Sequence, residues 1–297
     1  MPYSVNTDYK SQSFNNRIRF LVLHYTAANF KTSLETLTKG NVSAHYLVPE
    51  EPMDDKRELF SLVPDDKRAW HAGTSAWQNR ENLNDTSIGI EIVNLGYVDE
   101  RGNRKWVPFA DYQIETVIEL SKYIINRYKI QPTDIVGHGD IAPGRKVDPG
   151  PLFPWKTLYE RGVGAWYNEA DKVAAESEFA QETIDILWVQ KNLKTYGYSV
   201  KTTGELDQQT KKVVTAFQMH FRPSNYSGIP DCETCAILQA LVKKYYPTAT
   251  LSEKQKHGGD KSSKQMRSSL FSSQPIAMGC DSQMEKDPTN SSTPLTR

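Results

Sequence analysis

The chain has 297 residues, and its 36 basic and 36 acidic side chains leave no formal net charge. A neutral chain lacks the basic surface of a nucleic-acid-binding protein, so we expect no nucleic-acid partner. No apolar run reaches the ~18 residues that a transmembrane helix needs. Only three cysteines occur, Cys232, Cys235 and Cys280, and they establish no disulfide framework. The length suits one large or two smaller domains, and we expect a monomer.

Short apolar runs and one long amphipathic segment predict an α/β fold in the first half of the chain. Glycine and proline punctuate these runs, and apolar residues recur at helical spacing between 111 and 128. The order of elements indicates a mixed central sheet flanked by helices. The predicted strands are residues 17–25, 44–49, 59–63, 87–93 and 134–138, and the predicted helices are residues 33–39 and 111–128.

The segment from His138 to Gly150 is too rich in glycine and proline to be a helix, and it predicts an active-site loop. It contains His138 and Asp148. His24 lies near the end of another apolar strand, so the two histidines would emerge at the same sheet edge if the strands are neighbours. Two imidazoles, a carboxylate and an open position for water suit a catalytic zinc site. An ordinary loop histidine and an N-cap aspartate explain the same spacing equally well.

Two further segments carry candidate site residues. Between residues 87 and 93 the isoleucines alternate on one face, which places Glu91 on the opposite face; an exposed sheet face is the simpler explanation of such a glutamate. Residues 69–77 contain two tryptophans and His71 among small residues, a composition suited to a groove. Trp77 could stack on a sugar ring, or it could be packed in the core.

Five segments, in order along the chain, resemble those of the zinc-dependent N-acetylmuramoyl-L-alanine amidases of the amidase-2 family. The resemblance is strongest to the AmiD-type bacterial peptidoglycan amidases. It covers roughly residues 15–165 and continues to about 247. The five segments are Leu-Val-Leu-His-Tyr-Thr-Ala (21–27), Val-Ser-Ala-His-Tyr-Leu-Val (42–48), Ala-Trp-His-Ala-Gly (69–73), Asn-Asp-Thr-Ser-Ile-Gly-Ile-Glu (84–91) and the loop 138–150.

The resemblance implies a hydrolase that cleaves the amide between N-acetylmuramic acid and L-alanine of peptidoglycan or muropeptides. One zinc ion per chain would be held by His24, His138 and Asp148. Glu91 would accept a proton from water, and Lys146 would stabilise the oxyanion. Substrate-lining positions implied in the same way are His45, His71, Trp77 and Asn84.

Two alternative functions remain open at this point. A peptidoglycan-recognition module would keep the groove without catalysis, but the chain retains all three ligands together with Glu91 and Lys146. A zinc peptidase would act within the stem peptide, but the chain has no His-Glu-x-x-His motif.

The chain divides into three predicted regions: a catalytic domain at 15–167, a three-helix peptidoglycan-binding-like domain at 180–247, and a disordered tail at 248–297. The turn 201–207, with Asp207 as N-cap, and the piece 215–218 carry the second resemblance. The linker 168–182 is short and its composition is helical. The pair Cys232 and Cys235 is interpreted as a helix start, because no second cysteine pair accompanies it.

Localisation stays open. Residues 1–16 are polar and lack the apolar segment of a signal peptide, and no lipobox is visible. Members of the resembled family usually reside in the cell envelope.

Overall fold

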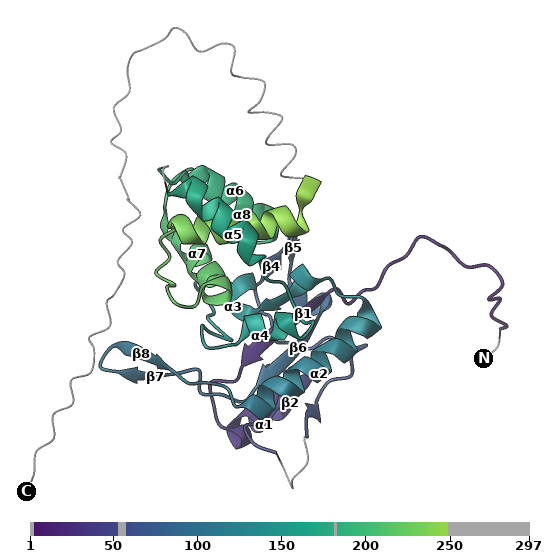
Figure 1. Ribbon diagram of the computed structural model, residues 1–297. Helices are drawn as coiled ribbons and strands as arrows, with labels where there is room; N and C mark the ends of the chain where they lie inside the picture. The colour runs from purple at the N-terminus through teal and green to yellow at the C-terminus, as the bar shows by residue number, and fades with distance from the viewer. Residues whose placement is uncertain (1–2, 53–57, 181–182, 249–297) are drawn as a thin grey trace, which may run out of the picture.

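The computed structural model describes residues 3–52, 58–180 and 183–248. The predicted tail at 248–297 therefore lies, apart from its first residue, outside the described residues. A region built on a β-sheet lies beneath a group of helices formed by the second half of the chain (Figure 1). None of the described helices combines the length and the apolar character needed to cross a bilayer.

The central sheet is mixed and has five strands in the order β3-β2-β6-β1-β9. The three strands that matter for the site are parallel, because β1 pairs with both β6 and β9 in that sense. Parallel central strands are buried on both faces, which explains their continuous apolar runs. The strands are β1 (Phe20–Tyr25), β2 (Tyr46–Val48), β3 (Phe60–Ser61), β6 (Ser87–Ile92) and β9 (Ile135–Gly137).

Helices cover the sheet on both faces. The long helix α2 (Asp111–Tyr128) begins and ends where its periodicity predicts, and Figure 1 shows it lying along one face of the sheet. Its buried residues join the cluster that contains Ile88, Ile90 and Ile92. On the other face, Leu37 of α1 (Phe30–Lys39) packs with Leu47 and Val93. Glu91 lies on this second face, because it alternates along β6 with Ile90 and Ile92.

Helix α1 begins earlier than predicted. Ser33 was expected as its cap, but the helix starts at Phe30 because the Asn29 side chain accepts a hydrogen bond from the Thr32 amide at 3.0 Å. The predicted stop at Gly40 is confirmed. Strand ends also differ from the predicted ones by up to three residues, as fraying at element boundaries leads one to expect.

Short elements connect the sheet strands and build the rim of the site. The β7–β8 hairpin projects away from the rest of the chain (Figure 1). These elements are β4 (Ala76–Trp77), β5 (Arg80–Glu81), the 3-10 turns at Leu83–Asp85 and Pro132–Asp134, β7 (Tyr97–Glu100), β8 (Asn103–Trp106), α3 (His138–Ile141) and α4 (Trp155–Glu160).

After residue 168 the described residues form four helices, here called the C-terminal helices: α5 (Glu169–Phe179), α6 (Ile186–Tyr196), α7 (Gln208–Phe221) and α8 (Cys232–Tyr245). The three predicted helical patterns correspond to α6, α7 and α8. Asp207 caps α7 as predicted by accepting from the Thr210 amide at 2.7 Å, and α8 begins at Cys232. The predicted linker contains a full helix, α5, whose Asp171 pairs with Lys243 of α8.

The same hydrogen-bond pattern occurs in the turn between α6 and α7 and in the turn between α7 and α8. The buried Gln190 accepts from the Gly204 amide and donates to Thr210, and the buried Gln218 accepts from the Gly228 amide and donates to Thr234. In each case the threonine hydroxyl follows an aspartate N-cap by three residues. Satisfying these buried polar groups holds both interhelical turns in a defined geometry.

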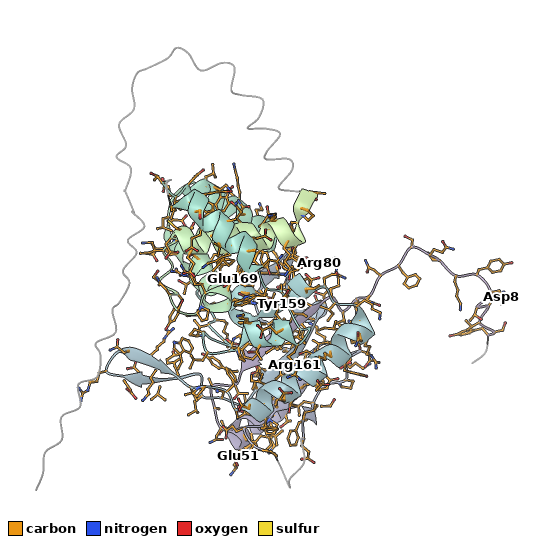
Figure 2. All side chains as sticks on the ribbon, in the orientation of Figure 1. Asp8, Glu51, Arg80, Tyr159, Arg161 and Glu169 are labelled. Carbon is orange, nitrogen blue, oxygen red and sulfur yellow. The ribbon has the colours of Figure 1, made fainter. Side chains whose placement is uncertain are left out.

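The C-terminal helices are docked firmly on the sheet region. One buried hydrophobic cluster runs through both, and in it Trp77 of β4 packs edge-on against Tyr198, with ring centroids 4.7 Å apart. Polar contacts add to it, since Lys244 donates to the Tyr159 hydroxyl at 2.8 Å and to the Trp166 carbonyl at 2.9 Å. Figure 2 labels Tyr159 and Glu169 where the two regions meet.

Candidate active site

The sheet register brings the three predicted metal ligands together. His24 of β1 pairs with Glu91 of β6, and Leu23 pairs with Gly137 of β9, so His138 follows directly beside His24. The loop after α3 then returns Asp148 to the same edge. Here the Gly139 amide donates to the Asp148 carbonyl at 2.7 Å. Carboxyl ends of parallel strands thus form the site, as is usual in sheets of this kind.

Three potential ligand atoms converge in a buried position. His24 Nδ1 and His138 Nδ1 lie 3.0 Å apart, and each lies 3.1 Å from Asp148 Oδ2. All three residues are buried. A buried cluster of two imidazoles and a carboxylate at such distances is a candidate metal site.

A chain of hydrogen bonds determines where the proton of the His24 ring sits. The Ser87 hydroxyl donates to the Leu83 carbonyl at 2.6 Å, so its oxygen accepts from His71 Nε2 at 3.1 Å. His71 Nδ1 is then an acceptor, and His24 Nε2 donates to it at 3.0 Å. His24 Nδ1 consequently carries a lone pair, which faces His138 and Asp148.

The His138 ring is oriented in the same way. Its Nε2 lies 3.0 Å from the Ala72 carbonyl, which accepts the ring proton. Arg145 also approaches this nitrogen, but its Nη2 donates to the Ala72 and Thr74 carbonyls at 2.8 and 2.7 Å. His138 Nδ1 therefore also carries a lone pair, and this lone pair faces the site. Second partners of this kind fix the tautomer of metal-binding histidines.

Three acceptor atoms thus face one another without a donor between them, an arrangement that a cation would stabilise. Burial and the nearby His138 lower the pKa of His24 to about 4, which keeps its imidazole neutral at pH 7. Burial by itself would raise the pKa of Asp148, but the two histidines outweigh it and hold that pKa below its usual range. Neutral imidazoles and an ionised carboxylate are the forms that bind a metal ion.

Glu91 and Lys146 lie at the open side of this cluster. Glu91 Oε1 is 4.0 Å from His24 Nδ1, and its Oε2 is buried and has no hydrogen-bond partner among the described residues. Burial and the charge of Asp148 raise the pKa of Glu91 well above its ordinary value. A cleft of about 570 Å³ opens here, and its lining includes Glu91, Lys146, His71, His138 and Asp148.

His71 and Asn84, which were predicted to line the substrate cleft, differ in position. His71 lies at the cleft and supports His24 from behind. Gly89 makes room for it, because a Cβ on Gly89 would lie 2.5 Å from the His71 ring. Asn84 is buried, and its Oδ1 accepts from the His71 and Ala72 amides at 3.1 and 2.7 Å. Asn84 therefore holds the segment that orients His24 and His138 instead of lining the cleft.

Two residues predicted to line the cleft, His45 and Trp77, lie in the interior instead. His45 is buried between strands, where its Nδ1 accepts from the Gly89 amide at 3.0 Å. Trp77 is 1% exposed, and its indole donates to the Thr133 carbonyl at 3.1 Å. The packing interpretation of Trp77 is the one that its surroundings support, because Tyr196 and Tyr198 cover its ring.

Replacing Trp77 with alanine should lower the free energy of unfolding by about 3–5 kcal/mol, because the change empties a fully buried site. Trp70→Ala is the matched control. Its indole is 52% exposed and stacks on Arg68, so a loss of at most about 1 kcal/mol is expected. Urea unfolding measures both. A Trp77→Ala protein as stable as wild type would contradict the packing interpretation of Trp77.

The sequence did not single out Trp70, Tyr25, Tyr97 and Arg145, which also line the cleft. Trp70 stands beside the quoted motif, yet no spacing rule distinguishes it from Trp77. Tyr25 follows His24 at the end of β1, and Tyr97 comes from the hairpin, far along the chain. Their positions depend on the way in which the loops fold back over the sheet edge.

The chain matches known families over both regions. Residues 14–151 match the family described as N-acetylmuramoyl-L-alanine amidase, and residues 183–238 match a peptidoglycan binding domain family. The amidase AmiD of Escherichia coli is 46% identical over 247 residues, which are 82% of this chain and 89% of that protein. The 1,6-anhydro-N-acetylmuramyl-L-alanine amidase AmpD of E. coli is 40% identical over 114 residues, which are 38% of this chain and 55% of that protein.

Two solved structures are similar over both regions. E. coli AmiD in complex with anhydro-N-acetylmuramic acid-L-Ala-D-γ-Glu-L-Lys has a TM-score of 0.77 at 46% identity, covering 82% of this chain and 95% of that one. AmpDh3 of Pseudomonas aeruginosa in complex with an anhydromuramic pentapeptide has a TM-score of 0.77 at 44% identity, covering 82% of this chain and 99% of that one. With this likeness over most of its length, the chain belongs to the amidase-2 family of N-acetylmuramoyl-L-alanine amidases.

Proposed function

We propose that the protein hydrolyses the amide bond between N-acetylmuramic acid and L-alanine in peptidoglycan or muropeptides, with one zinc ion held by His24, His138 and Asp148. The observation that carries the metal assignment is the meeting of three buried acceptor atoms with no donor between them. The substrate class is supported by the muropeptides bound in the AmiD and AmpDh3 structures.

The donor set fits zinc. Ligand bonds of about 2.0–2.1 Å at tetrahedral angles place ligand atoms about 3.3 Å apart, close to the 3.0–3.1 Å found here. A site with three protein ligands leaves a fourth position open, as catalytic zinc sites do. When bound, zinc would supply a Lewis acid that polarises the scissile carbonyl and acidifies an attacking water.

Side chains of the protein would transfer the proton, stabilise the oxyanion and orient the two imidazoles. Glu91, whose pKa is raised by burial and by the charge of Asp148, accepts the proton of the attacking water and returns it to the leaving amine. Lys146 lines the same cleft and places an ammonium group beside the developing oxyanion. His71 and the Ala72 carbonyl keep the two ligand imidazoles in the tautomers that the site requires.

The C-terminal helices would hold the enzyme on the polymer. This proposal is supported by the match of residues 183–238 to a peptidoglycan binding family. Binding sites linked in one chain raise the local concentration of substrate at the catalytic centre. The benefit is expected for insoluble sacculi and not for small muropeptides, which diffuse freely.

Digestion of purified muropeptides tests the proposed reaction. Mass spectrometry should detect the free stem peptide with an L-alanine amino terminus together with the lactyl-bearing sugar, and treatment with a chelator should stop their release. Cleavage at any other bond of the stem peptide would instead identify a peptidase. Binding of muropeptide without any cleavage would identify a recognition protein.

A further inference from the structure

A buried polar cluster ties the loop that carries the metal ligands to the C-terminal helices. Its centre is Asp140 of α3, two residues after His138. One carboxylate oxygen, Oδ1, accepts from the Tyr198 hydroxyl at 2.6 Å. The other, Oδ2, accepts from His220 Nδ1 at 2.8 Å and from the Gly137 amide at 2.7 Å. Both side-chain donors come from the C-terminal region, so two of the three bonds cross between regions.

The backbone contacts of this cluster lead directly to the ligands. Gly137, which donates to Asp140, immediately precedes His138, and the Gly139 amide donates to the carbonyl of Asp148. Gly137 has no room for a side chain, because a Cβ there would lie 2.6 Å from Pro149 Cδ. We call residues 138–150, which carry His138 and Asp148, the ligand loop. A displacement of Asp140 would therefore be transmitted to the backbone at both of these residues.

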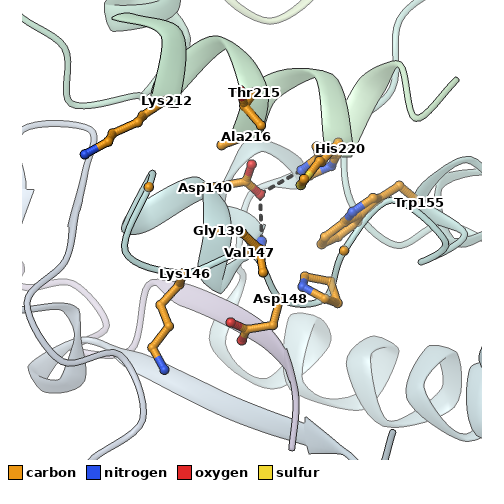
Figure 3. Close-up of a pocket in the computed structure, with 15 residues that line it drawn as sticks. Gly139, Asp140, Lys146, Val147, Asp148, Trp155, Lys212, Thr215, Ala216 and His220 are labelled. Carbon is orange, nitrogen blue, oxygen red and sulfur yellow. Dashed lines mark hydrogen bonds and ion pairs between the residues drawn. The ribbon is translucent and has the colours of Figure 1, made fainter. Parts of the chain in front are cut away.

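The ring of His220 also contacts the segment that follows the ligand loop. It stacks on Trp155, the first residue of α4, with ring centroids 3.8 Å apart and planes inclined by 13°. Asp140 lies two residues after His138, and Trp155 lies seven residues after Asp148, so one imidazole contacts residues close in sequence to both ligands. Figure 3 shows Asp140 joined to His220 of α7, with Trp155 on the other side of the imidazole and with Gly139 and Val147 between Asp140 and Asp148.

A second contact from α7 lies over the middle of the loop. The aliphatic part of Lys212 covers Gly144, where a Cβ would lie 2.3 Å from Lys212 Cδ. Between these contacts remains a small cavity of about 100 Å³, lined by Gly137, Asp140, Lys212 and His220 among others. The ligand loop is thus enclosed by α7 on the side away from the substrate cleft.

We infer that Asp140, held by Tyr198 and His220, is a positioning residue of the metal centre, so that the C-terminal helices are part of the machinery that holds zinc. The inference rests on the proposed function, because it concerns the same metal site. None of the three residues lines the substrate cleft, so they act through the ligand loop and not through substrate. Groups that orient metal ligands raise metal affinity by limiting the geometries that the ligands can adopt.

Two conservative changes in the full-length protein remove the donors and keep the ring shapes. Tyr198→Phe removes the hydroxyl that donates to Asp140. His220→Phe removes the ring N–H and retains an aromatic ring against Trp155. The matched control is Tyr245→Phe, which also removes a hydroxyl bond between the regions, at 3.2 Å from the Trp166 carbonyl, but away from the ligand loop.

Zinc affinity is measured by competition with a chromophoric chelator in the absence of substrate, and the coordination geometry is followed by the absorption spectrum of the cobalt-loaded protein. Tyr198→Phe and His220→Phe should each bind zinc roughly tenfold more weakly, the lower end of the loss expected for groups behind a ligand. Both should alter the cobalt spectrum. Tyr245→Phe should bind zinc within about twofold of wild type, with an unchanged spectrum.

Thermal unfolding in excess chelator separates stability from metal binding. Variants that melt earlier but bind zinc as tightly as wild type would overturn the inference, leaving Asp140 as a bond between regions only. Equal loss in Tyr245→Phe would overturn it as well. If one of the two variants, Tyr198→Phe or His220→Phe, fails to fold, the zinc affinity of the other tests the inference. A wild-type protein that binds no zinc in the same assay would contradict the proposed function itself, a result that is distinct from loss in the variants alone.

Discussion

Asp148→Asn is expected to abolish both zinc binding and amide hydrolysis. The change preserves shape but removes the only negative charge among the three converging atoms of the proposed metal site. The loss of zinc affinity should exceed the ~10–100-fold typical of groups that merely orient ligands. Activity should fall to background at zinc concentrations that saturate the wild-type enzyme. Metal analysis after gel filtration and turnover of a soluble muropeptide measure the two effects.

Asp134→Asn is the matched control, because Asp134 is also a buried carboxylate near a strand end but lies outside the ligand cluster. Burial raises its pKa from 3.8 to about 6. The folded state therefore disfavours the ionised form, and the resulting loss of stability develops as the pH rises from 3.8 and is complete above about 6. Asparagine removes this penalty, so Asp134→Asn should keep zinc and melt at an equal or higher temperature at pH 8. An Asp148→Asn protein with full zinc would contradict the ligand assignment.

Glu91→Gln is expected to retain zinc and to lose turnover by about 10²–10⁴-fold, the usual contribution of a general base. The amide keeps the size of the side chain but cannot accept the proton of the attacking water. Because Glu91 Oε1 lies 4.0 Å from His24 Nδ1, outside the cluster of ligand atoms, zinc affinity should change little. Steady-state kinetics should show the loss in kcat, with KM nearly unchanged.

The exposed Glu119 supplies a matched control for this change. It pairs with Lys122 on the outer surface of α2, and Glu119→Gln should leave kcat and zinc content unchanged. Wild-type turnover in Glu91→Gln would make Glu91 an ordinary residue of the sheet. Loss of zinc in that variant would instead show that Glu91 contributes to holding the metal ion.

Much of the sheet, and the meeting of the two candidate ligand histidines, could be predicted from the sequence for a physical reason. Apolar runs that end in histidine indicate buried strands, and the carboxyl ends of parallel strands meet at one edge. His24 and His138 therefore lie where the pattern places them. The residues alone suggested His24, His138 and Asp148 as a metal site but explained them equally well as ordinary loop residues, and the family resemblance favoured the metal site and supplied the role of Glu91.

What could not be predicted depends on contacts between distant parts of the chain. Trp77 and Trp70 are alike in local sequence, but Tyr196 and Tyr198, more than a hundred residues later, bury the first and leave the second exposed. His220 likewise has no local signal. Its importance arises only because the C-terminal helices bring it within 2.8 Å of Asp140.

The proposed zinc centre is tested most directly by titrating the metal-free protein with zinc while following hydrolysis of a muropeptide at the bond before L-alanine. Activity should be absent at the start, rise in proportion to the zinc bound, and reach its plateau at about one ion per chain. Hydrolysis at an undiminished rate by the metal-free protein would contradict the proposed zinc centre of His24, His138 and Asp148.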